Sequence, residues 1–190
     1  IGAGAIGVEF AYFYKAFGTQ VTVVEMLPNL LPVEDSEVSQ ALEKSFQKQG
    51  IKVLTSHKTT KTETTASGVR ITVEDSKGAS QVLEAEVCLV AIGVQPLLPG
   101  GAIKPALTER GYIQTNERYE TNIPGVYAAG DIIGPPWLAH VASFEAVQAV
   151  NGMFQAGFKP RKVGAFPGCT YCQPQVASVG LTERAAKEKG

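Results

Sequence analysis

The sequence predicts an α/β fold in which a parallel sheet is interrupted by an antiparallel meander. A glycine-rich turn at residues 2–7 opens an apolar helical stretch at 5–17, and a β-branched run at 21–24 follows. A second helical pattern and a second short apolar run come next, and such alternation is typical of parallel sheets. Residues 59–87 then alternate polar and apolar side chains around two glycine-containing turns, which is typical of antiparallel strands. Together these observations indicate a Rossmann-like unit that carries a meander.

The first half of the chain supplies the parallel elements. Residues 5–17 form a helix with few charges, suited to packing on a sheet, and residues 21–24 form a buried parallel strand. Asp35 or Ser36 caps a second helix that places three apolar side chains on one face, namely Val38, Leu42 and Phe46. Residues 51–54 are the next strand. Only the first strand of the unit is missing, because a single residue precedes the glycine-rich turn.

The second half changes character after one more apolar run. Residues 88–92 are continuously apolar and predict a buried strand. A Pro/Gly-rich linker leads to a second block that ends in a helix at about 139–156. A further strand at 176–180 and a charged helix from Thr182 close the chain. We therefore expect three parts, with boundaries at 1–96, 97–163 and 164–190.

The composition excludes several classes of protein. The 190 residues are 44% hydrophobic and 18% charged, so a packed core is expected and disorder is not. The net charge of −1 gives no support for nucleic acid or an anionic membrane as partner. No apolar run is long enough to span a bilayer. Three cysteines do not make a disulfide scaffold and favour a reducing compartment.

The glycine-rich turn predicts a dinucleotide site. In a GxGxxG fingerprint, Gly2 permits the tight turn, Gly4 lets the backbone approach a pyrophosphate, and Gly7 lets helix and strand pack closely. The phosphates then lie at the helix N-terminus, where free N–H groups favour anions. Glu25 follows the last glycine by 18 residues, close to the spacing of a carboxylate that binds a ribose 2′-OH. No Arg or Lys occurs from Met26 to Pro32 to bind a 2′-phosphate, so the sequence favours NAD over NADP.

Several motifs in fixed order carry a family resemblance. They are Gly2-Ala-Gly-Ala-Ile-Gly, Val21-Thr-Val-Val-Glu, Ala91-Ile-Gly-Val-Gln-Pro, Thr121-Asn-Ile-Pro-Gly-Val-Tyr-Ala-Ala-Gly-Asp, Leu138-Ala-His-Val-Ala and Pro174-Gln-Val-Ala-Ser-Val-Gly-Leu-Thr-Glu. The chain resembles the pyridine nucleotide–disulfide oxidoreductases over essentially its whole length, and most closely the dihydrolipoamide dehydrogenases among them. The resemblance implies an NAD-binding domain at 1–96, the C-terminal part of an FAD-binding domain at 97–163, and the start of an α+β dimerisation domain at 164–190. We thus expect an internal piece of a longer protein.

The resemblance also implies an activity and partners. It implies FAD and NAD as cofactors, with electrons passing from dihydrolipoamide through an enzyme disulfide and FAD to NAD. The lipoamide would be carried by the acyltransferase of a 2-oxoacid dehydrogenase complex, and the enzyme would be a homodimer in a bacterial cytoplasm or an organelle matrix. Two alternatives stay open. One is another NADH-dependent disulfide or mercuric reductase, and the other is a non-catalytic nucleotide-binding piece.

The resemblance assigns cofactor-binding residues but no catalytic or metal-binding residue within this chain. Asp131 would bind the FAD ribitol, and the helix opened by Ala139 would point at the flavin pyrimidine. Glu9 would pair with a lysine near the flavin, Gly93 would pass close to NAD, and Thr59 would lie on the adenine side. The complete expected set is Gly2, Gly4, Ala5, Ile6, Gly7, Glu9, Glu25, Thr59, Gly93, Gly130, Asp131, Leu138, Ala139 and His140. Because the redox disulfide and the His–Glu acid–base pair fall outside these residues, we expect no lipoamide turnover and weak FAD binding from residues 1–190 alone.

Three other features have simpler explanations. Cys169 and Cys172 have the CxxC spacing of a redox pair or half a zinc site, but no second pair exists, so we favour a structural role. The resemblance gives His140 a backbone contact with the flavin rather than a role as base. His57 lies in a polar stretch and is expected at the surface.

Overall fold

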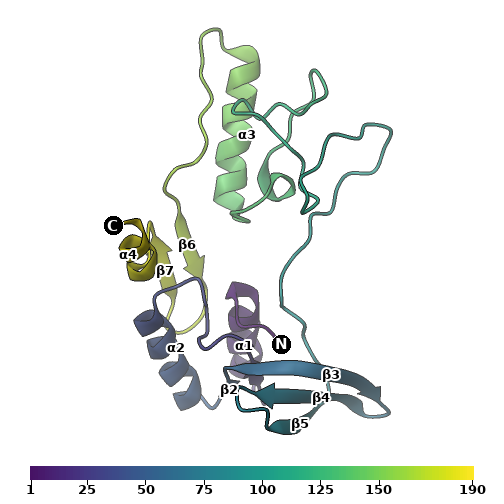
Figure 1. Cartoon of the computed structure of the whole chain (residues 1–190), viewed down its shortest axis with the longest axis vertical. Coiled ribbons are helices and arrows are strands. Elements are labelled where there is room, and N and C mark those ends of the chain that lie inside the picture. The colour runs from purple at the N-terminus through teal and green to yellow at the C-terminus, as the bar shows by residue number, and fades with distance from the viewer. The chain divides into compact units, whose positions relative to one another are not determined.

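The computed structural model describes residues 1–190, which divide into two compact units (Figure 1). The first unit comprises residues 1–93 and 167–190, and the second comprises residues 94–166. Of residues 164–190, which were expected to start a separate domain, 167–190 therefore group with the first unit and 164–166 with the second. No helix combines the length and apolar character that crossing a membrane requires.

The parallel elements of the first unit form as expected. They are α1 (Ala5–Ala16), β1 (Thr22–Val24), α2 (Ser36–Lys48) and β2 (Lys52–Leu54). β1 and β2 pair in parallel, with Thr22 opposite Lys52 and Val24 opposite Leu54. The α-helical connection between two parallel strands is the unit that a parallel sheet requires.

Backbone hydrogen bonds extend this layer beyond β1. The Gly2 N–H donates to the Val24 carbonyl at 2.8 Å. On its other side, Ile1 donates to the carbonyl of Leu89 at 2.8 Å and accepts from the Ala91 N–H at 2.7 Å. Residues 1–2 thus lie between β1 and residues 89–91, and β2 is outermost. This is the order of a Rossmann half, in which the chain reverses its direction of winding beside the first strand.

The expectation of a buried strand at 88–92 is wrong. Residues 88–91 have no regular secondary structure and Ile92 lies in a bend, and Val90 and Ile92 are 59% and 75% exposed. They contact only Ile1 through backbone hydrogen bonds, and one partner residue cannot build a ladder or cover their side chains. The apolar run therefore predicted the position of this segment in the layer but not its burial.

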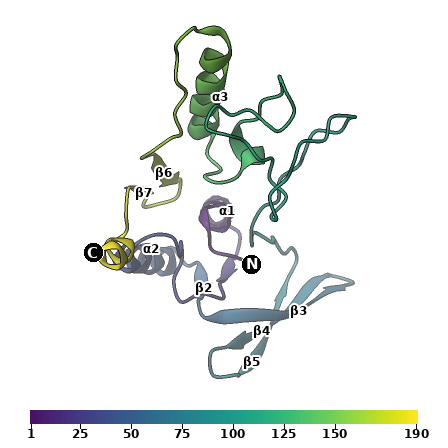
Figure 2. The same ribbon diagram turned by 45° about the horizontal axis from the view of Figure 1, so that its top comes forward.

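The predicted meander is confirmed. β3 (His57–Thr65), β4 (Gly68–Asp75) and β5 (Ser80–Ala85) form an antiparallel sheet in chain order (Figure 2). A bulge between Thr59 and Lys61 shifts the register of β3 against β4. Val73 of β4 is fully buried and clusters with Ile71 and with Val24 of β1, which attaches the meander to the parallel layer.

Helices α1 and α2 bury narrower faces than their sequences predict. α2 buries Ser39, Leu42 and Phe46, whereas Val38 is exposed. The Ser39 hydroxyl donates to the Leu31 carbonyl at 3.4 Å, which satisfies it in the interior. α1 buries only small or short side chains on its inner face, and its aromatic side chains Phe10, Phe13 and Tyr14 stay exposed, as does Phe17 at its C-cap. Both helices still supply the main core cluster.

The C-terminal segment adds a hairpin and a helix to the first unit. β6 (Pro167–Thr170), which the sequence did not predict, pairs antiparallel with β7 (Val176–Val179). Cys172 and Val176 are buried in the same cluster as α1 and α2. The predicted charged helix is α4 (Glu183–Lys189), and the Thr182 hydroxyl caps it by accepting from the Ala185 N–H at 3.2 Å.

The second unit is built around one helix. The predicted helix at 139–156 is α3 (Ala139–Phe154), and a 3₁₀ turn, η1 (Gly130–Ile133), packs against it. Tyr119 is fully buried, and its hydroxyl donates to the Arg161 carbonyl at 3.0 Å. Burial, followed by the charges of Glu145 and Glu117, raises the pKa of Tyr119 to about 12.

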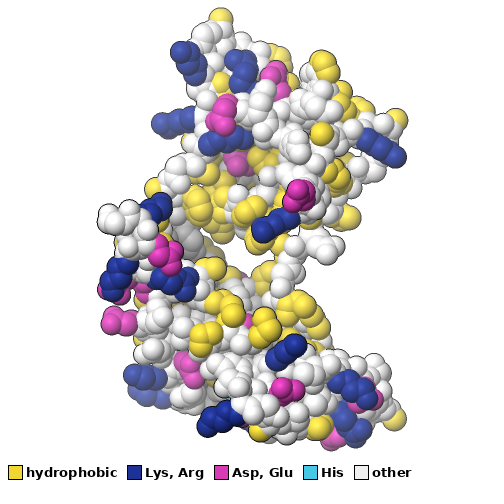
Figure 3. Space-filling view, viewed as in Figure 1, with side chains coloured by type: hydrophobic (Ala, Val, Ile, Leu, Met, Phe, Trp, Pro, Cys, Tyr) yellow, Lys and Arg dark blue, Asp and Glu magenta, His cyan; other side chains and the backbone are white.

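Charged side chains of both signs are interspersed over the face drawn in Figure 3. This agrees with the formal net charge of −1. Positive residues do not gather there into the continuous basic patch that nucleic-acid binding uses.

Candidate nucleotide-binding site

Two glycines of the fingerprint are required by packing. Gly2 has φ +96°, and a Cβ on it would overlap the carbonyl oxygen of Ala91. A Cβ on Gly7 would overlap the carbonyl oxygen of Gly2. These contacts hold the glycine-rich turn tightly between residues 89–91 and α1. The roles predicted for Gly2 and Gly7 therefore have a direct steric basis.

Gly4 differs from its neighbours because its side-chain position is open. Its φ of −69° and ψ of −177° suit any residue, so the backbone does not demand glycine here. No atom of the protein lies within 4 Å of the position that a Cβ would take. Gly4 is also the N-cap of α1, where no side chain caps the helix and the first turn holds no acidic residue. The free N–H groups of this turn can bind an anion, and a Cβ on Gly4 would stand in its way.

Glu25 is tied to the glycine-rich turn. Its side chain is only 9% exposed, at the end of β1. Oε2 accepts the Ala3 N–H at 2.7 Å, and Oε1 accepts the Leu27 N–H at 2.8 Å. Each carboxylate oxygen retains a second lone pair that a ribose hydroxyl can use. The preference for NAD over NADP that the sequence predicts depends on this carboxylate and stays a prediction.

Gly93 also faces open space. Its φ of +144° is rarely adopted by other residues, and no protein atom lies within 4 Å of its Cβ position. It follows residues 89–91, which lie beside residues 1–2. In open α/β sheets, ligands bind at the point where the strand order reverses. Gly93 and the turn that contains Gly4 are both adjacent to that point. Two further residues of the predicted site, Ala5 and Ile6, are exposed on the first turn of α1.

Two other predicted residues of the first unit have partners or surroundings that the sequence did not indicate. Glu9 is partly buried, and its Oε1 accepts the Tyr171 N–H at 2.8 Å. The Thr59 hydroxyl is buried next to the β3 bulge and makes no hydrogen bond. The cofactor contacts proposed for Glu9 and Thr59 remain predictions.

The second unit presents Asp131 beside the start of α3. Gly130 has φ +78°, and a Cβ on it would lie 3.0 Å from the Cβ of Ala142. Asp131 is exposed, and no protein donor bonds its carboxylate. α3 begins after Leu138 without a side-chain cap, and Ala139 and His140 are exposed on its first turn. An unpaired hydroxyl acceptor and an uncapped helix start suit a polyhydroxylated ligand with an electron-rich ring.

Glu145 contacts this turn from α3, and it was not among the residues predicted from the sequence. It lies on α3, is 8% exposed, and its Oε2 accepts the Gly130 N–H at 2.7 Å. It also borders a cavity of about 530 Å³ with Lys162, Pro135 and Pro136. One signal was available, because Glu145 is the only acidic or basic side chain besides His140 in the sixteen residues of α3.

The CxxC segment has the properties of a structural element. Cys88, Cys169 and Cys172 are all free thiols. Cys172 is buried, and its Sγ donates to the Pro174 carbonyl at 3.1 Å. Burial, with smaller contributions from Glu9 and Cys169, raises the pKa of Cys172 to about 11. Reactive cysteines need the opposite shift, so the structural interpretation is favoured.

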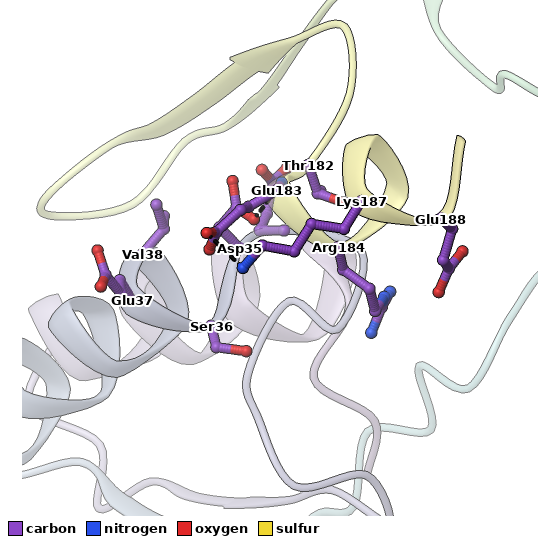
Figure 4. A pocket seen from close by; sticks show the side chains of 10 residues that line it. Asp35, Ser36, Glu37, Val38, Thr182, Glu183, Arg184, Lys187 and Glu188 are labelled. Carbon is purple, nitrogen blue, oxygen red and sulfur yellow. Dashed lines mark hydrogen bonds and ion pairs between the residues drawn. The ribbon is translucent and has the colours of Figure 1, made fainter. Parts of the chain in front are cut away.

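A surface pocket of the first unit lies away from the glycine-rich turn. It has a volume of about 690 Å³ and lies between the start of α2 and α4 (Figure 4). Acidic and basic side chains mix along it, and Asp35 accepts the Glu183 N–H at 2.9 Å. None of the predicted cofactor-binding residues lines it.

Comparisons with known proteins agree with this geometry. The family model described as pyridine nucleotide-disulphide oxidoreductase matches residues 1–146. The dihydrolipoyl dehydrogenase of Rhizobium etli is 45% identical over 195 residues, which cover the whole chain and 40% of that protein. The dihydrolipoyl dehydrogenase of Mycobacterium tuberculosis is 43% identical over 197 residues, covering the whole chain and 41% of that protein.

Solved structures match as well. LpdA from Mycobacterium tuberculosis has a TM-score of 0.83 and 27% identity, over 99% of this chain and 41% of that one. The HOCl-induced flavoprotein disulfide reductase RclA from Escherichia coli has a TM-score of 0.85 and 25% identity, over the whole chain and 43% of RclA. The chain thus spans about 40% of the length of the curated relatives it matches. The predicted Rossmann-like fold and the predicted resemblance are both confirmed, and the chain belongs to the pyridine nucleotide–disulphide oxidoreductase family.

Proposed function

We propose that residues 1–190 are the NAD-binding part and a portion of the FAD-binding part of a dihydrolipoamide dehydrogenase. Relatives named dihydrolipoyl dehydrogenase match the whole chain at up to 45% identity, which supports this choice within the family. The observation that carries the nucleotide role is the hydrogen bond between the buried Glu25 carboxylate and the Ala3 N–H of the glycine-rich turn. It places a hydroxyl acceptor beside an open helix N-terminus, which is the arrangement that a dinucleotide requires.

The residues present suit NAD. The α1 N-terminus and the open side of Gly4 would receive the pyrophosphate, and Glu25 would accept from the adenosine ribose. Gly93 would allow the nucleotide to pass close to the backbone. When bound, NAD supplies the hydride-accepting chemistry, while the chain supplies orientation and electrostatics.

The residues present also suit part of an FAD site. Asp131 offers an exposed carboxylate without a protein donor, and this would accept a ribitol hydroxyl. The N-terminus of α3 would stabilise negative charge on the reduced flavin ring. When bound, FAD supplies the redox chemistry between thiols and nicotinamide.

The wider activity follows from the same proposal. The substrate would be dihydrolipoamide carried on the acyltransferase of a 2-oxoacid dehydrogenase complex, and the enzyme would be a homodimer. Cys172 is not assigned to the redox disulfide, because its raised pKa opposes thiolate formation. A second candidate, reduction of another disulfide substrate, is favoured by the match to the flavoprotein disulfide reductase RclA.

The nucleotide role is tested by titrating the purified chain with NADH and NADPH by calorimetry. We expect NADH to bind more tightly, because the Glu25 charge disfavours the 2′-phosphate. Tighter NADPH binding would contradict the role of Glu25. The substrate is tested on the complete enzyme by NAD reduction with dihydrolipoamide, beside NADH oxidation with glutathione disulfide or mercuric ion. Turnover of dihydrolipoamide by residues 1–190 alone would contradict the expectation that this part lacks the thiol chemistry.

A further inference from the structure

Glu145 is a buried carboxylate whose place in the fold requires an explanation. A carboxylate removed from water is costly unless donors surround it, so such groups are rarely retained without a role. Glu145 is 8% exposed on a helix that holds no other acidic residue, and it points its Oε2 at the backbone N–H of Gly130 across 2.7 Å. A short bond of this kind between a charged acceptor and an amide is roughly twice as strong as a neutral one.

The turn that Glu145 holds is the one that presents Asp131. Gly130 adopts φ +78°, and the backbone returns to α3 closely enough that a Cβ would lie 3.0 Å from the Cβ of Ala142. Ala142 and Glu145 are three residues apart, so they share one face of α3 and contact the turn together. The Asp131 carbonyl accepts the Gly134 N–H at 3.4 Å, but its carboxylate gains no hydrogen bond from the protein, so the direction of that carboxylate depends on the backbone of the turn.

The first unit uses the same arrangement. There the buried Glu25 accepts the Ala3 N–H of the glycine-rich turn, also at 2.7 Å. Glu25 and Glu145 are the only two acidic side chains that are buried in the chain. Each binds a backbone N–H in a glycine-containing turn that is expected to meet a nucleotide. This correspondence suggests a second role for the Glu145 contact: it orders a ligand-binding turn in addition to stabilising the packing of that turn on α3.

We propose that Glu145 is a positioning residue that fixes the Gly130–Asp131 turn so that the Asp131 carboxylate meets the flavin ribitol. The inference rests on the proposed flavin site. Glu145 acts through the Gly130 amide and does not contact the cofactor itself. Its loss would let the turn relax and would leave the Gly130 N–H without an acceptor.

The test compares three variants of the complete flavoenzyme. Glu145→Ala removes the acceptor, whereas Glu145→Gln keeps an oxygen of the same reach and loses only the charge. Gln148→Ala is the matched control, because Gln148 is 9% exposed one turn further along α3 and its Oε1 accepts the Arg161 N–H at 3.2 Å. Both alanine variants remove a buried acceptor from α3, but only the first releases the flavin turn.

We expect Glu145→Ala to weaken FAD binding about tenfold or more, and Glu145→Gln to stay within about threefold of the wild type. Gln148→Ala should lower the melting temperature without changing FAD affinity or the flavin absorption spectrum. Hydrogen exchange at the Gly130 amide gives a readout that needs no activity, and it should accelerate in Glu145→Ala alone. If Glu145→Ala does not fold, the same exchange rate can be measured in Glu145→Gln. The Gly130 amide should stay protected in that variant, because the glutamine oxygen still accepts its hydrogen bond.

The outcomes separate the two proposals. Wild-type protein that binds no FAD refutes the proposed function and this inference with it. Wild-type protein that binds FAD, with Glu145→Ala binding equally well or Gln148→Ala weakened to the same extent, refutes only the positioning role. An unprotected Gly130 amide in the folded wild type also refutes it.

Discussion

Replacement of Gly4 by alanine separates a ligand role from a folding role within one turn. The conformation of Gly4 is open to any residue, and its Cβ position has no protein neighbour within 4 Å. A Gly→Ala change at such a position stabilises a protein by about 0.4–1 kcal/mol, because the unfolded chain loses freedom. Gly4→Ala should therefore leave the melting temperature unchanged or raise it slightly.

The same methyl group should weaken NAD binding. It would project into the open space in front of the α1 N-terminus, where the pyrophosphate needs to approach the backbone. Loss of one hydrogen bond to a charged group costs about 1.5–3 kcal/mol. At about 1.4 kcal/mol per factor of ten, the dissociation constant for NADH should rise roughly 10- to 100-fold.

Gly7→Ala is the matched control. Its methyl group would overlap the carbonyl oxygen of Gly2, so the turn or α1 has to move. Overpacking of this kind costs about 1–3 kcal/mol, which lowers the melting temperature by several degrees. Calorimetric NADH titration and thermal unfolding of both variants complete the assay. Gly4→Ala protein that binds NADH like the wild type, or that melts as early as Gly7→Ala, would refute the assignment of these two glycines.

Three further predictions concern buried polar groups. Glu25→Ala should destabilise the first unit by about 1–3 kcal/mol, because the Ala3 and Leu27 amides lose their acceptor. The same variant should reduce the ratio of NADH affinity to NADPH affinity. Unchanged stability and an unchanged affinity ratio would contradict both roles of Glu25. The Cys172 thiol, with its pKa raised to about 11, should resist iodoacetamide at pH 8 while the partly exposed thiols of Cys88 and Cys169 react. Because the folded state holds that proton more tightly, this thiol's contribution to stability should be intact below about pH 8.5 and fall as the pH rises towards 11; a rise in stability over that window would show that the direction is wrong. Tyr119→Phe should cost about 1 kcal/mol in urea unfolding through the lost bond to the Arg161 carbonyl, and no cost would show that the bond contributes nothing.

Much of the fold was predictable because its signals are local. The α1 and α3 helices, the parallel pair and the meander follow from periodicity and from turns that contain glycine. Burial was less predictable, because it depends on which elements lie opposite. Residues 88–92 carry a core-like sequence but form backbone hydrogen bonds with Ile1 alone, and Val90 and Ile92 stay exposed. The aromatic side chains Phe10, Phe13 and Tyr14 of α1 are exposed as well.

In the candidate site, too, the local pattern was predictable and the packing contacts were not. Spacing along the chain identified Gly2, Gly4, Gly7 and Glu25, because the fingerprint and its acidic partner belong to one continuous βαβ unit. Spacing could not reveal that Glu25 binds the Ala3 amide or that Glu145 binds the Gly130 amide. Those contacts are set by how an element packs on a turn, and the single acidic residue of α3 was the only hint.

The two buried glutamates also place a constraint on altering nucleotide preference. A turn that binds phosphate through its backbone cannot use side chains to hold its own shape, so the acceptor that orders it comes from a neighbouring element. In the first unit that acceptor is Glu25, which is also the residue expected to disfavour a 2′-phosphate. Glu25→Arg would favour the phosphate but leave the Ala3 and Leu27 amides without a partner. Glu25→Gln keeps an acceptor and removes the charge, so it should shift the preference towards NADPH at a smaller cost in stability. If Glu25→Gln were as destabilised as Glu25→Ala, the carboxylate charge rather than the hydrogen bond would order the turn.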